Sequence, residues 1–431
     1  MQNKKIAILG GGLTGLTLAN LLQENFQIEV FEKDVTPGGL CRSFNFENFI
    51  FDIGGHIIFS KDQEAFDFMI KTIGTKNLFS AKGNDAIVYN KKLINYPFET
   101  DLAKIGQQEA YECLFDFVYN SVKDPKNFHQ WLHATFGKAL AEKYLVPYNR
   151  KVWKIEPKDL DMNWVAKIPK PDPEELIKSC MGIPFEVKFE RKRFFYPKFG
   201  GIQTLTENLA KKVKNLHLDA AVERIYRKKN GWIIKVNGKE DFFDDVISTV
   251  PVFNLVDILK EKIPSEVKKA LRCFRYNSIM IACLGVDAKK ITDITALYFP
   301  DEDFYPNRVC FMNNFGRNNA PKNKNSVLCE ITYNPKSELA KMSDKEILKN
   351  VIEGFDKRKI IPKSKIIFQK LLRFPYAYVV FDKNYSKNVG IVYDWLKRKK
   401  IATVGRFAEF QYLNMDACIR HSIDFAKNYK L

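Results

Sequence analysis

The chain has 431 residues, a formal net charge of +18 at pH 7, and 45% hydrophobic and 13% aromatic residues. This length exceeds one ordinary hydrophobic core, so we expect two or three domains, and the composition excludes a disordered or fibrous protein. The basic residues are scattered and form neither a compact basic block nor a nucleic-acid motif. The charge therefore favours a lysine-rich surface and an anionic small ligand over nucleic acid.

The opening sequence KKIAILGGGLTG carries the pattern of a strand that runs into a glycine-rich turn and a helix, and a second apolar run ends in Glu32. In a dinucleotide fold, Gly10 allows the tight turn, Gly12 lets the backbone approach a pyrophosphate, and Gly15 lets the helix pack closely on the strand. The helix N-terminus offers unpaired N–H groups to phosphates. Glu32 is spaced to accept hydrogen bonds from a ribose, so the segment predicts dinucleotide binding.

Beyond this unit, the hydrophobic pattern alternates between helical and strand-like segments. Helices are predicted at Gln107–Val122 and Phe128–Leu145, and strands at Ser278–Val286, Ser326–Tyr333 and Ile401–Val404. α/β character returns near residue 196 and again in the last 30 residues, and an interrupted cofactor domain is typical of a large flavoprotein. We therefore predict an α/β fold with three parts: a discontinuous Rossmann-like FAD-binding domain (1–60, 196–260 and 395–431), an inserted mainly helical domain (61–190) and a mixed or antiparallel β-sheet substrate domain (261–394).

The eight cysteines contain no CxxC pair and do not cluster, which predicts reduced thiols without a disulfide framework or a zinc site. No signal-peptide pattern precedes the first strand, and no apolar run reaches the ~20 residues of a membrane-spanning helix. We therefore expect a cytoplasmic protein without a membrane span. No metal is predicted, and we interpret four of the histidines as structural: His129, His133, His217 and His421.

Two short motifs follow Glu32: PGGLCRS at residues 37–43 and FDIGGH at residues 51–56. With the N-terminal unit they resemble a large family of FAD enzymes that includes amine oxidases, protoporphyrinogen oxidase and UDP-galactopyranose mutase. The resemblance implies FAD as the cofactor. It implies these cofactor-binding residues: Gly10, Gly12, Leu13, Thr14, Gly15, Glu32, Lys33, Gly39, Leu40, Arg42, Gly54, Gly55, Val222, Gly405, Arg406, Asn414 and Met415.

Further motifs follow in the order GGHIIFS (54–60), YPF (96–98), PYNRKVW (147–153), LYFP (297–300) with Arg308, and GRF (405–407). They resemble UDP-galactopyranose mutase, especially the eukaryotic type. The resemblance implies His56 beside the flavin and Arg308 and Lys167 on a diphosphate. The implied substrate pocket is Tyr96, Phe98, Asn149, Trp153, Tyr298, Tyr376 and Tyr412. Core packing is the alternative interpretation for Phe98 and Trp153, and Tyr378 is the alternative to Tyr376.

The resemblance implies an isomerase that interconverts UDP-galactopyranose and UDP-galactofuranose, with N5 of reduced FAD as the nucleophile at the anomeric carbon. NAD(P)H is the expected external reductant, and the product would serve cell-surface polysaccharide biosynthesis. The alternative is an FAD-dependent oxidase or dehydrogenase of the amine oxidase or protoporphyrinogen oxidase kind, and a third hypothesis is a non-catalytic FAD-binding protein.

Three departures from the mutase pattern leave the sugar and the nucleotide open. Lys167 stands where the family has an arginine, Glu99 where a neutral glutamine would suit uracil, and Phe315 where a tyrosine is expected. The oligomeric state is also open, a homo-oligomer included.

Overall fold

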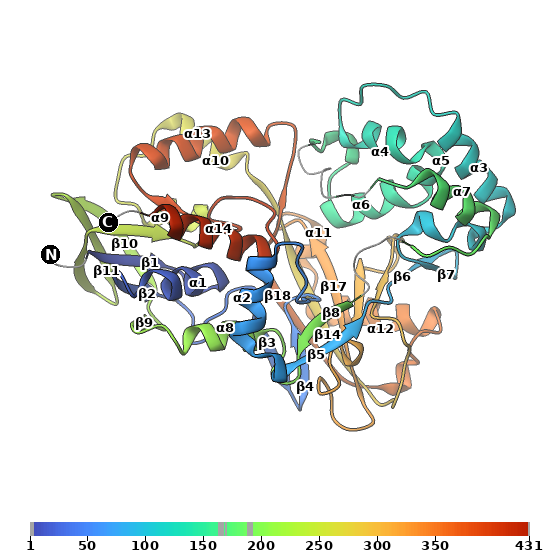
Figure 1. Cartoon of the computed structure of the whole chain (residues 1–431), viewed down its shortest axis with the longest axis horizontal. Helices are drawn as coiled ribbons and strands as arrows, with labels where there is room; N and C mark the ends of the chain where they lie inside the picture. The colour runs from blue at the N-terminus through green and yellow to red at the C-terminus, as the bar shows by residue number, and fades with distance from the viewer. Residues whose placement is uncertain (1–3, 163–167, 169, 188–192, 430–431) are drawn as a thin grey trace.

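The computed structural model describes residues 4–162, 168, 170–187 and 193–429. A five-stranded parallel sheet lies at one end of the molecule, where both termini also lie (Figure 1). Its strand order is β19 (Ala402–Thr403), β13 (Asp245–Ser248), β1 (Lys5–Leu9), β2 (Gln27–Phe31) and β9 (Leu216–His217). Widely separated parts of the chain therefore build this one sheet.

The central strand β1 buries both of its faces, as strands of parallel sheets do. Ile6 and Ile8 point into one hydrophobic cluster, whereas Ala7 and Leu9 point into another. The first cluster lies beneath α1 (Leu13–Leu22), α2 (Gln63–Ile73), α8 (Gln203–Ala210) and α14 (Met415–Asn428). On the other face lie α9 (Val252–Ile258), α10 (Ser265–Arg272), α13 (Tyr385–Arg398) and the antiparallel sheet β10 (Val222–Lys228), β11 (Gly231–Val236) and β12 (Lys239–Phe243).

A seven-stranded mixed sheet forms the middle of the molecule (Figure 1). Its order is β18 (Ile366–Val380), β14 (Arg275–Val286), β17 (Asn325–Tyr333), β16 (Arg308–Phe311), β15 (Ala296–Tyr298), β6 (Ala86–Tyr89) and β7 (Lys92–Asn95). One face packs on α12 (Asp344–Lys357), with the short α11 (Glu338–Lys341) nearby. The other face belongs to the cluster shared with the helical part.

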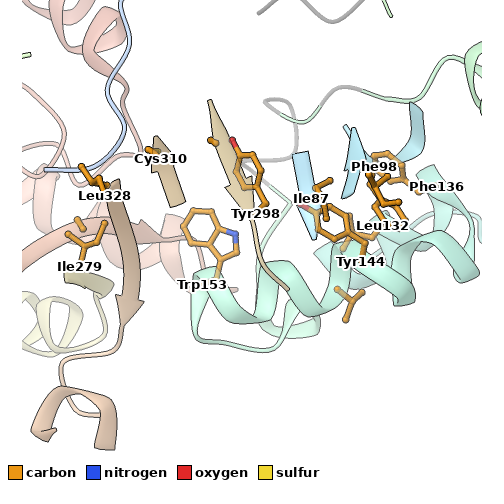
Figure 2. Packing of buried hydrophobic residues seen from close by; sticks show 14 of the residues in the cluster. Ile87, Phe98, Leu132, Phe136, Tyr144, Trp153, Ile279, Tyr298, Cys310 and Leu328 are labelled. Carbon is orange, nitrogen blue, oxygen red and sulfur yellow. The ribbon is translucent and has the colours of Figure 1, made fainter. Parts of the chain in front are cut away.

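The helical part comprises α3 (Gln107–Val118), α4 (Phe128–Phe136), α5 (Lys138–Leu140), a π-helical turn (Ala141–Leu145), α6 (Val146–Trp153) and α7 (Pro173–Met181). Figure 2 shows its core, in which Phe98, Leu132 and Tyr144 pack together and Trp153 and Tyr298 continue toward the sheet.

Three predicted segments differ from the observed ones. The helix predicted over residues 107–122 ends at Val118. The single helix predicted over residues 128–145 is interrupted at Gly137, whose φ is +80° and where a side chain would lie 2.7 Å from the Phe117 nitrogen. The segment 61–190, predicted as mainly helical, also contributes three strands, since β6 and β7 extend the central sheet and β5 (Leu78–Lys82) pairs with β8 (Arg193–Pro197). These pairings join residues far apart in sequence, which local periodicity cannot detect.

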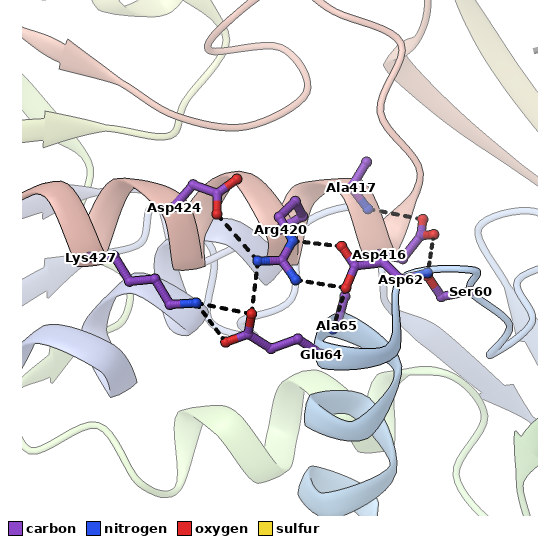
Figure 3. Close-up of polar contacts among 9 residues, drawn as sticks. All are labelled: Ser60, Asp62, Glu64, Ala65, Asp416, Ala417, Arg420, Asp424 and Lys427. Carbon is purple, nitrogen blue, oxygen red and sulfur yellow. Dashed lines mark hydrogen bonds and ion pairs between the residues drawn. The ribbon is translucent and has the colours of Figure 1, made fainter.

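An ion-pair network joins the C-terminal helix to the segment that follows the hairpin β3 (Ser43–Phe46) and β4 (Phe49–Asp52) (Figure 3). Arg420 on α14 donates to Asp62 at 2.6 and 2.7 Å and to Glu64 at 2.9 Å. Ser60 donates to Asp416 at 2.7 Å. The network therefore anchors the end of the loop that carries His56 to the start of α14.

Among the described residues, none of the helices combines the length and apolar character needed to cross a membrane.

Candidate functional site

A cavity of about 1050 Å³ extends from the carboxyl ends of β1 and β2 to one face of the central sheet. Glycine-rich loops line one end, and Arg308 with a group of tyrosines lines the other. This position, outside the carboxyl ends of parallel strands, is where open α/β sheets bind their ligands.

The glycine end has the shape of a dinucleotide cradle. A side chain at Gly15 would lie 2.0 Å from the Gly10 carbonyl oxygen, so α1 packs against the turn at a distance that only glycine permits. Gly12 begins α1 without a side-chain cap, which leaves the first N–H groups of the helix available to an anion. The Glu32 carboxylate accepts from the Gly11 nitrogen at 2.7 Å and faces the same space. These features fit a pyrophosphate and a ribose.

Most of the predicted cofactor residues lie along this cavity. The lining includes Gly10, Gly12, Leu13, Thr14, Glu32, Lys33, Gly39, Leu40, Arg42, Gly54, Gly55, Val222, Arg406, Asn414 and Met415. Gly15 and Gly405 are absent from the lining and lie one layer behind it. At Gly405, φ is +105° and a side chain would lie 2.6 Å from Oγ1 of Thr14, so this glycine allows close packing behind the cradle.

Arg406 lies in the cavity wall and donates hydrogen bonds to backbone carbonyls. Its Nη2 donates to the Ala377 carbonyl at 2.6 Å and its Nη1 to the Leu413 carbonyl at 2.5 Å, and its guanidinium lies 4.4 Å from the Tyr412 ring centroid. These bonds hold the end of β18 against the loop before α14. Its Nε also donates to the Ala377 carbonyl, at 3.1 Å, so all three guanidinium nitrogens already have a backbone partner and the side chain shapes the cavity.

The loop that carries His56 crosses the middle of the cavity. Gly54 has φ +96°, and a side chain at Gly55 would lie 2.6 Å from Sγ of Cys310, so the loop approaches β16 more closely than other residues allow. Burial lowers the pKa of His56 to about 4, which leaves the imidazole neutral at pH 7. Its buried Nδ1 has no hydrogen-bond partner among the described residues. A polar atom of this kind fits a site completed by a ligand.

Arg308 and Glu330 form an ion pair at the opposite end, in which the Glu330 side chain is buried and the Arg308 side chain is 23% exposed. Nε of Arg308 lies 2.8 Å from Oε1 of Glu330, and the Gly55 nitrogen donates to the same oxygen at 2.7 Å. Burial alone would lower the pKa of Arg308, but the Glu330 carboxylate more than offsets this, so the guanidinium stays charged. Glu330 therefore orients both the cation and the His56 loop.

Glu330 is a site residue that the sequence motifs did not predict. The available signal is a single acid within the otherwise uncharged strand NSVLCEITY, because a buried carboxylate requires a partner. Its partner, Arg308, was predicted from the sequence. The pairing of the two residues depends on the register of β16 and β17, in which Arg308 lies opposite Glu330.

Tyrosine rings surround Arg308. Tyr96 stacks on Tyr298 with centroids 4.9 Å apart, and Tyr148 contacts Tyr298 edge-on at 5.7 Å. Tyr378 stacks on Tyr412 at 5.9 Å. Burial raises the pKa of Tyr148, Tyr298 and Tyr378, so their hydroxyls remain hydrogen-bond donors at neutral pH. The arrangement supplies a cation and several O–H donors to one anionic ligand.

Two predicted substrate residues take other positions. Phe98 has no exposed surface, stacks on Tyr144 at 4.8 Å and is absent from the cavity lining, so the core-packing interpretation applies to it. Tyr376 reaches the lining but donates its hydroxyl to Asn254 on α9 at 3.1 Å. Tyr378, the alternative in the sequence, is the tyrosine beside Tyr412.

The remaining candidates lie around the same cavity. Asn149 and Trp153 line it, and Nε1 of Trp153 donates to Oδ1 of Asn149 at 3.1 Å. Phe315 lines the cavity, whereas Glu99 does not, and burial raises the pKa of Glu99 to about 7. Lys167 lies outside the described residues.

Comparison with known proteins gives one family match. The model of the flavin-containing amine oxidoreductases matches residues 13–365. A dTDP-fucopyranose mutase from Escherichia coli is 23% identical over 445 aligned positions, covering 99% of this chain and 98% of that protein.

Solved structures share the fold over nearly the whole chain. A reduced UDP-galactopyranose mutase has a TM-score of 0.90 at 23% identity, covering 98% of this chain and 95% of its own. A protoporphyrinogen oxidase candidate from Exiguobacterium sp. 255-15 has a TM-score of 0.77 at 15% identity, covering 99% and 98%. The predicted resemblance to flavin enzymes of the mutase kind and the predicted α/β fold class are thus confirmed.

Proposed function

Because the chain belongs to the flavin-containing amine oxidoreductase family, we propose that it binds FAD and interconverts the pyranose and furanose forms of a nucleotide sugar. The observation that carries this proposal is the Arg308 cation, 23% exposed, which shares one cavity with the glycine cradle and the His56 loop. An oxidase of cationic amines has no need of an anion-binding guanidinium there. The similarity to two nucleotide-sugar mutases over almost the whole chain supports the same assignment.

The glycine end would hold the cofactor. The N-terminus of α1 would hold the pyrophosphate, Glu32 would accept from a ribose hydroxyl, and the loops at Gly39 and Gly55 would hold the ring system. Bound FAD, once reduced, supplies a nucleophilic nitrogen, N5, for the anomeric carbon. An external reductant such as NAD(P)H would be required before the first turnover.

The chain's own residues bind and orient the substrate. Arg308 presents its guanidinium to the diphosphate and stabilises the charge that develops as the sugar–phosphate bond breaks. Hydroxyls of Tyr378 and Tyr412 would donate to phosphate oxygens, and the Tyr298 hydroxyl, which lies 3.4 Å from Oδ2 of Asp85, would exchange that acceptor for a phosphate oxygen. Neutral His56 positions its loop and does not supply a proton, because its pKa is about 4. Glu330 fixes the Arg308 orientation, so its action on the substrate is indirect.

We propose UDP-galactose as the substrate and dTDP-fucose as the rival. The test uses purified protein reduced with dithionite under anaerobic conditions, with UDP-galactofuranose and dTDP-fucofuranose in parallel and chromatographic separation of the pyranose products. Conversion should occur only in the reduced state. Arg308→Ala should abolish it with flavin still bound, whereas Arg272→Ala, an exposed position at the end of α10 outside the cavity lining, should behave as wild type. Failure with both sugars, together with amine or porphyrinogen oxidation by the oxidised protein, would establish the oxidase alternative.

A further inference from the structure

A second group of ligand-type side chains lies in the helical part, outside the cavity lining. His129 and His133 on α4 face Glu142 in the π-helical turn. Nε2 of His129 lies 2.9 Å from Oε1 of Glu142, and Nε2 of His133 lies 2.7 Å from the same oxygen. One ligand atom from each of the three residues lies within 4.8 Å of the others. Two imidazoles and a carboxylate therefore converge on one point.

Local structure explains this convergence. A spacing of four residues puts His129 and His133 on the same face of α4, and their ring centroids are 4.3 Å apart. The chain then reverses at Gly137, whose φ is +80°. The π-helical turn that follows directs Glu142 back toward α4, and turns of this kind are frequent at functional sites. The four-residue spacing of these two histidines is the sequence signal for a site, beside their interpretation as structural.

We propose that His129, His133 and Glu142 form a binding site for a divalent transition-metal ion, with Zn²⁺ as the best match. Imidazole nitrogens suit zinc, copper and nickel, whereas magnesium and calcium prefer oxygen ligands. Two histidines and one carboxylate supply three ligands of a tetrahedral site and leave the fourth position for water. The proposal does not depend on the function of the flavin cavity.

The observed distances are close to those a zinc ion requires. Zinc–ligand bonds of about 2.0–2.1 Å put two tetrahedral ligands about 3.4 Å apart. The present separations of 2.7 and 2.9 Å require the carboxylate oxygen to retreat by roughly half an ångström. The Glu142 side chain is 43% exposed and can rotate to allow this, whereas the His133 side chain is only 16% exposed and stays fixed.

The site has a structural consequence for the cavity. α5, the π-helical turn and α6 follow one another without a gap over residues 138–153. This run carries Tyr148, Asn149 and Trp153 into the cavity wall. An ion held between α4 and Glu142 would clamp the run to its neighbour, so metal binding should raise the melting temperature of the full-length protein.

Calorimetric titration of the chelator-treated full-length protein with ZnCl₂ tests the proposal. We expect one equivalent to bind saturably and the binding to weaken as the pH falls from 7 to 5.5, because the imidazoles must be neutral to bind metal. His133→Ala should weaken binding at least tenfold. His217→Ala removes another histidine that is paired to a glutamate and serves as the matched control, which should not alter binding. Circular dichroism of each metal-free variant verifies its fold.

A cobalt titration identifies the ligands independently. Bands of nitrogen and oxygen coordination that disappear in the His129→Ala and His133→Ala double variant support the site. Thiolate-to-cobalt charge-transfer bands, or undiminished zinc affinity in the folded double variant, would assign the metal to cysteines or to adventitious contacts and overturn the proposal.

Discussion

Substitution of Lys151 tests which interactions fix the loop at the Arg308 end of the cavity. The residue is 3% exposed, and its ammonium donates to the carbonyl oxygens of Phe299 at 2.9 Å and of Asp301, Phe304 and Pro306 at 2.7 Å each. These carbonyls belong to the loop between β15, which ends at Tyr298, and β16, which begins at Arg308. The Lys151 side chain on α6 therefore fixes the loop between two site residues, and its four accepting carbonyls favour the ammonium form although burial lowers its pKa.

The substitution Lys151→Met retains the apolar stem and removes the charge. Three ammonium protons shared among four carbonyls correspond to about 5–9 kcal/mol, at about 1.5–3 kcal/mol per charged hydrogen bond. The methionine variant no longer has to bury an ammonium group, which costs several kcal/mol, and this gain offsets part of the lost hydrogen-bond energy. We expect a net loss of about 2–5 kcal/mol in the free energy of unfolding.

Denaturant unfolding measures this loss, and ligand titration measures the site. Lys151→Met should bind nucleotide sugar roughly tenfold more weakly, equivalent to about 1.4 kcal/mol, while flavin content stays unchanged because the glycine cradle is remote from the loop. Lys178→Met removes a surface ion pair and should alter stability by less than about 0.5 kcal/mol. Unchanged stability and unchanged sugar affinity in Lys151→Met would refute the reasoning.

Three further predictions concern the cavity. Glu330→Gln should weaken substrate binding about tenfold with flavin retained, because Arg308 loses its charged partner; equilibrium titration checks this, and wild-type affinity would contradict it. Tyr378→Phe should raise the substrate Kd about fivefold to tenfold. The Tyr376 hydroxyl is bonded to Asn254, so Tyr376→Phe should leave the substrate Kd unchanged and lower the free energy of unfolding by about 1 kcal/mol. A larger effect on Kd from Tyr376→Phe than from Tyr378→Phe would make Tyr376 the substrate residue. Burial lowers the pKa of His56 to about 4 in the folded protein, whereas the pKa is about 6.5 in the unfolded chain. Between these values the unfolded chain binds the proton more readily. The stability that neutral His56 contributes is therefore lost as the pH falls from about 6.5 toward 4. Unfolding free energies at several pH values should decline by up to about 1.4 kcal/mol per pH unit across this range, and the decline should be shallower in His56→Asn.

The sequence alone determined the features that depend on neighbouring residues. The strand before Gly10, the close contact at Gly15 and the acid at Glu32 are all encoded within one βαβ unit, so pattern and spacing suffice to predict them. Arg308 was also identified from a short motif. The proposed division into domains stays a prediction, and its helical segment proved to include strands of the central sheet.

Only the tertiary structure decided which distant residues meet. The register of β16 and β17 pairs Arg308 with Glu330, and the reversal at Gly137 brings Glu142 to the two histidines of α4. Lys151 donates hydrogen bonds to carbonyls that lie about 150 residues further along the chain. A buried charge is tolerated only where its partners converge in space, and that convergence is a property of packing that hydrophobic periodicity along the sequence does not contain.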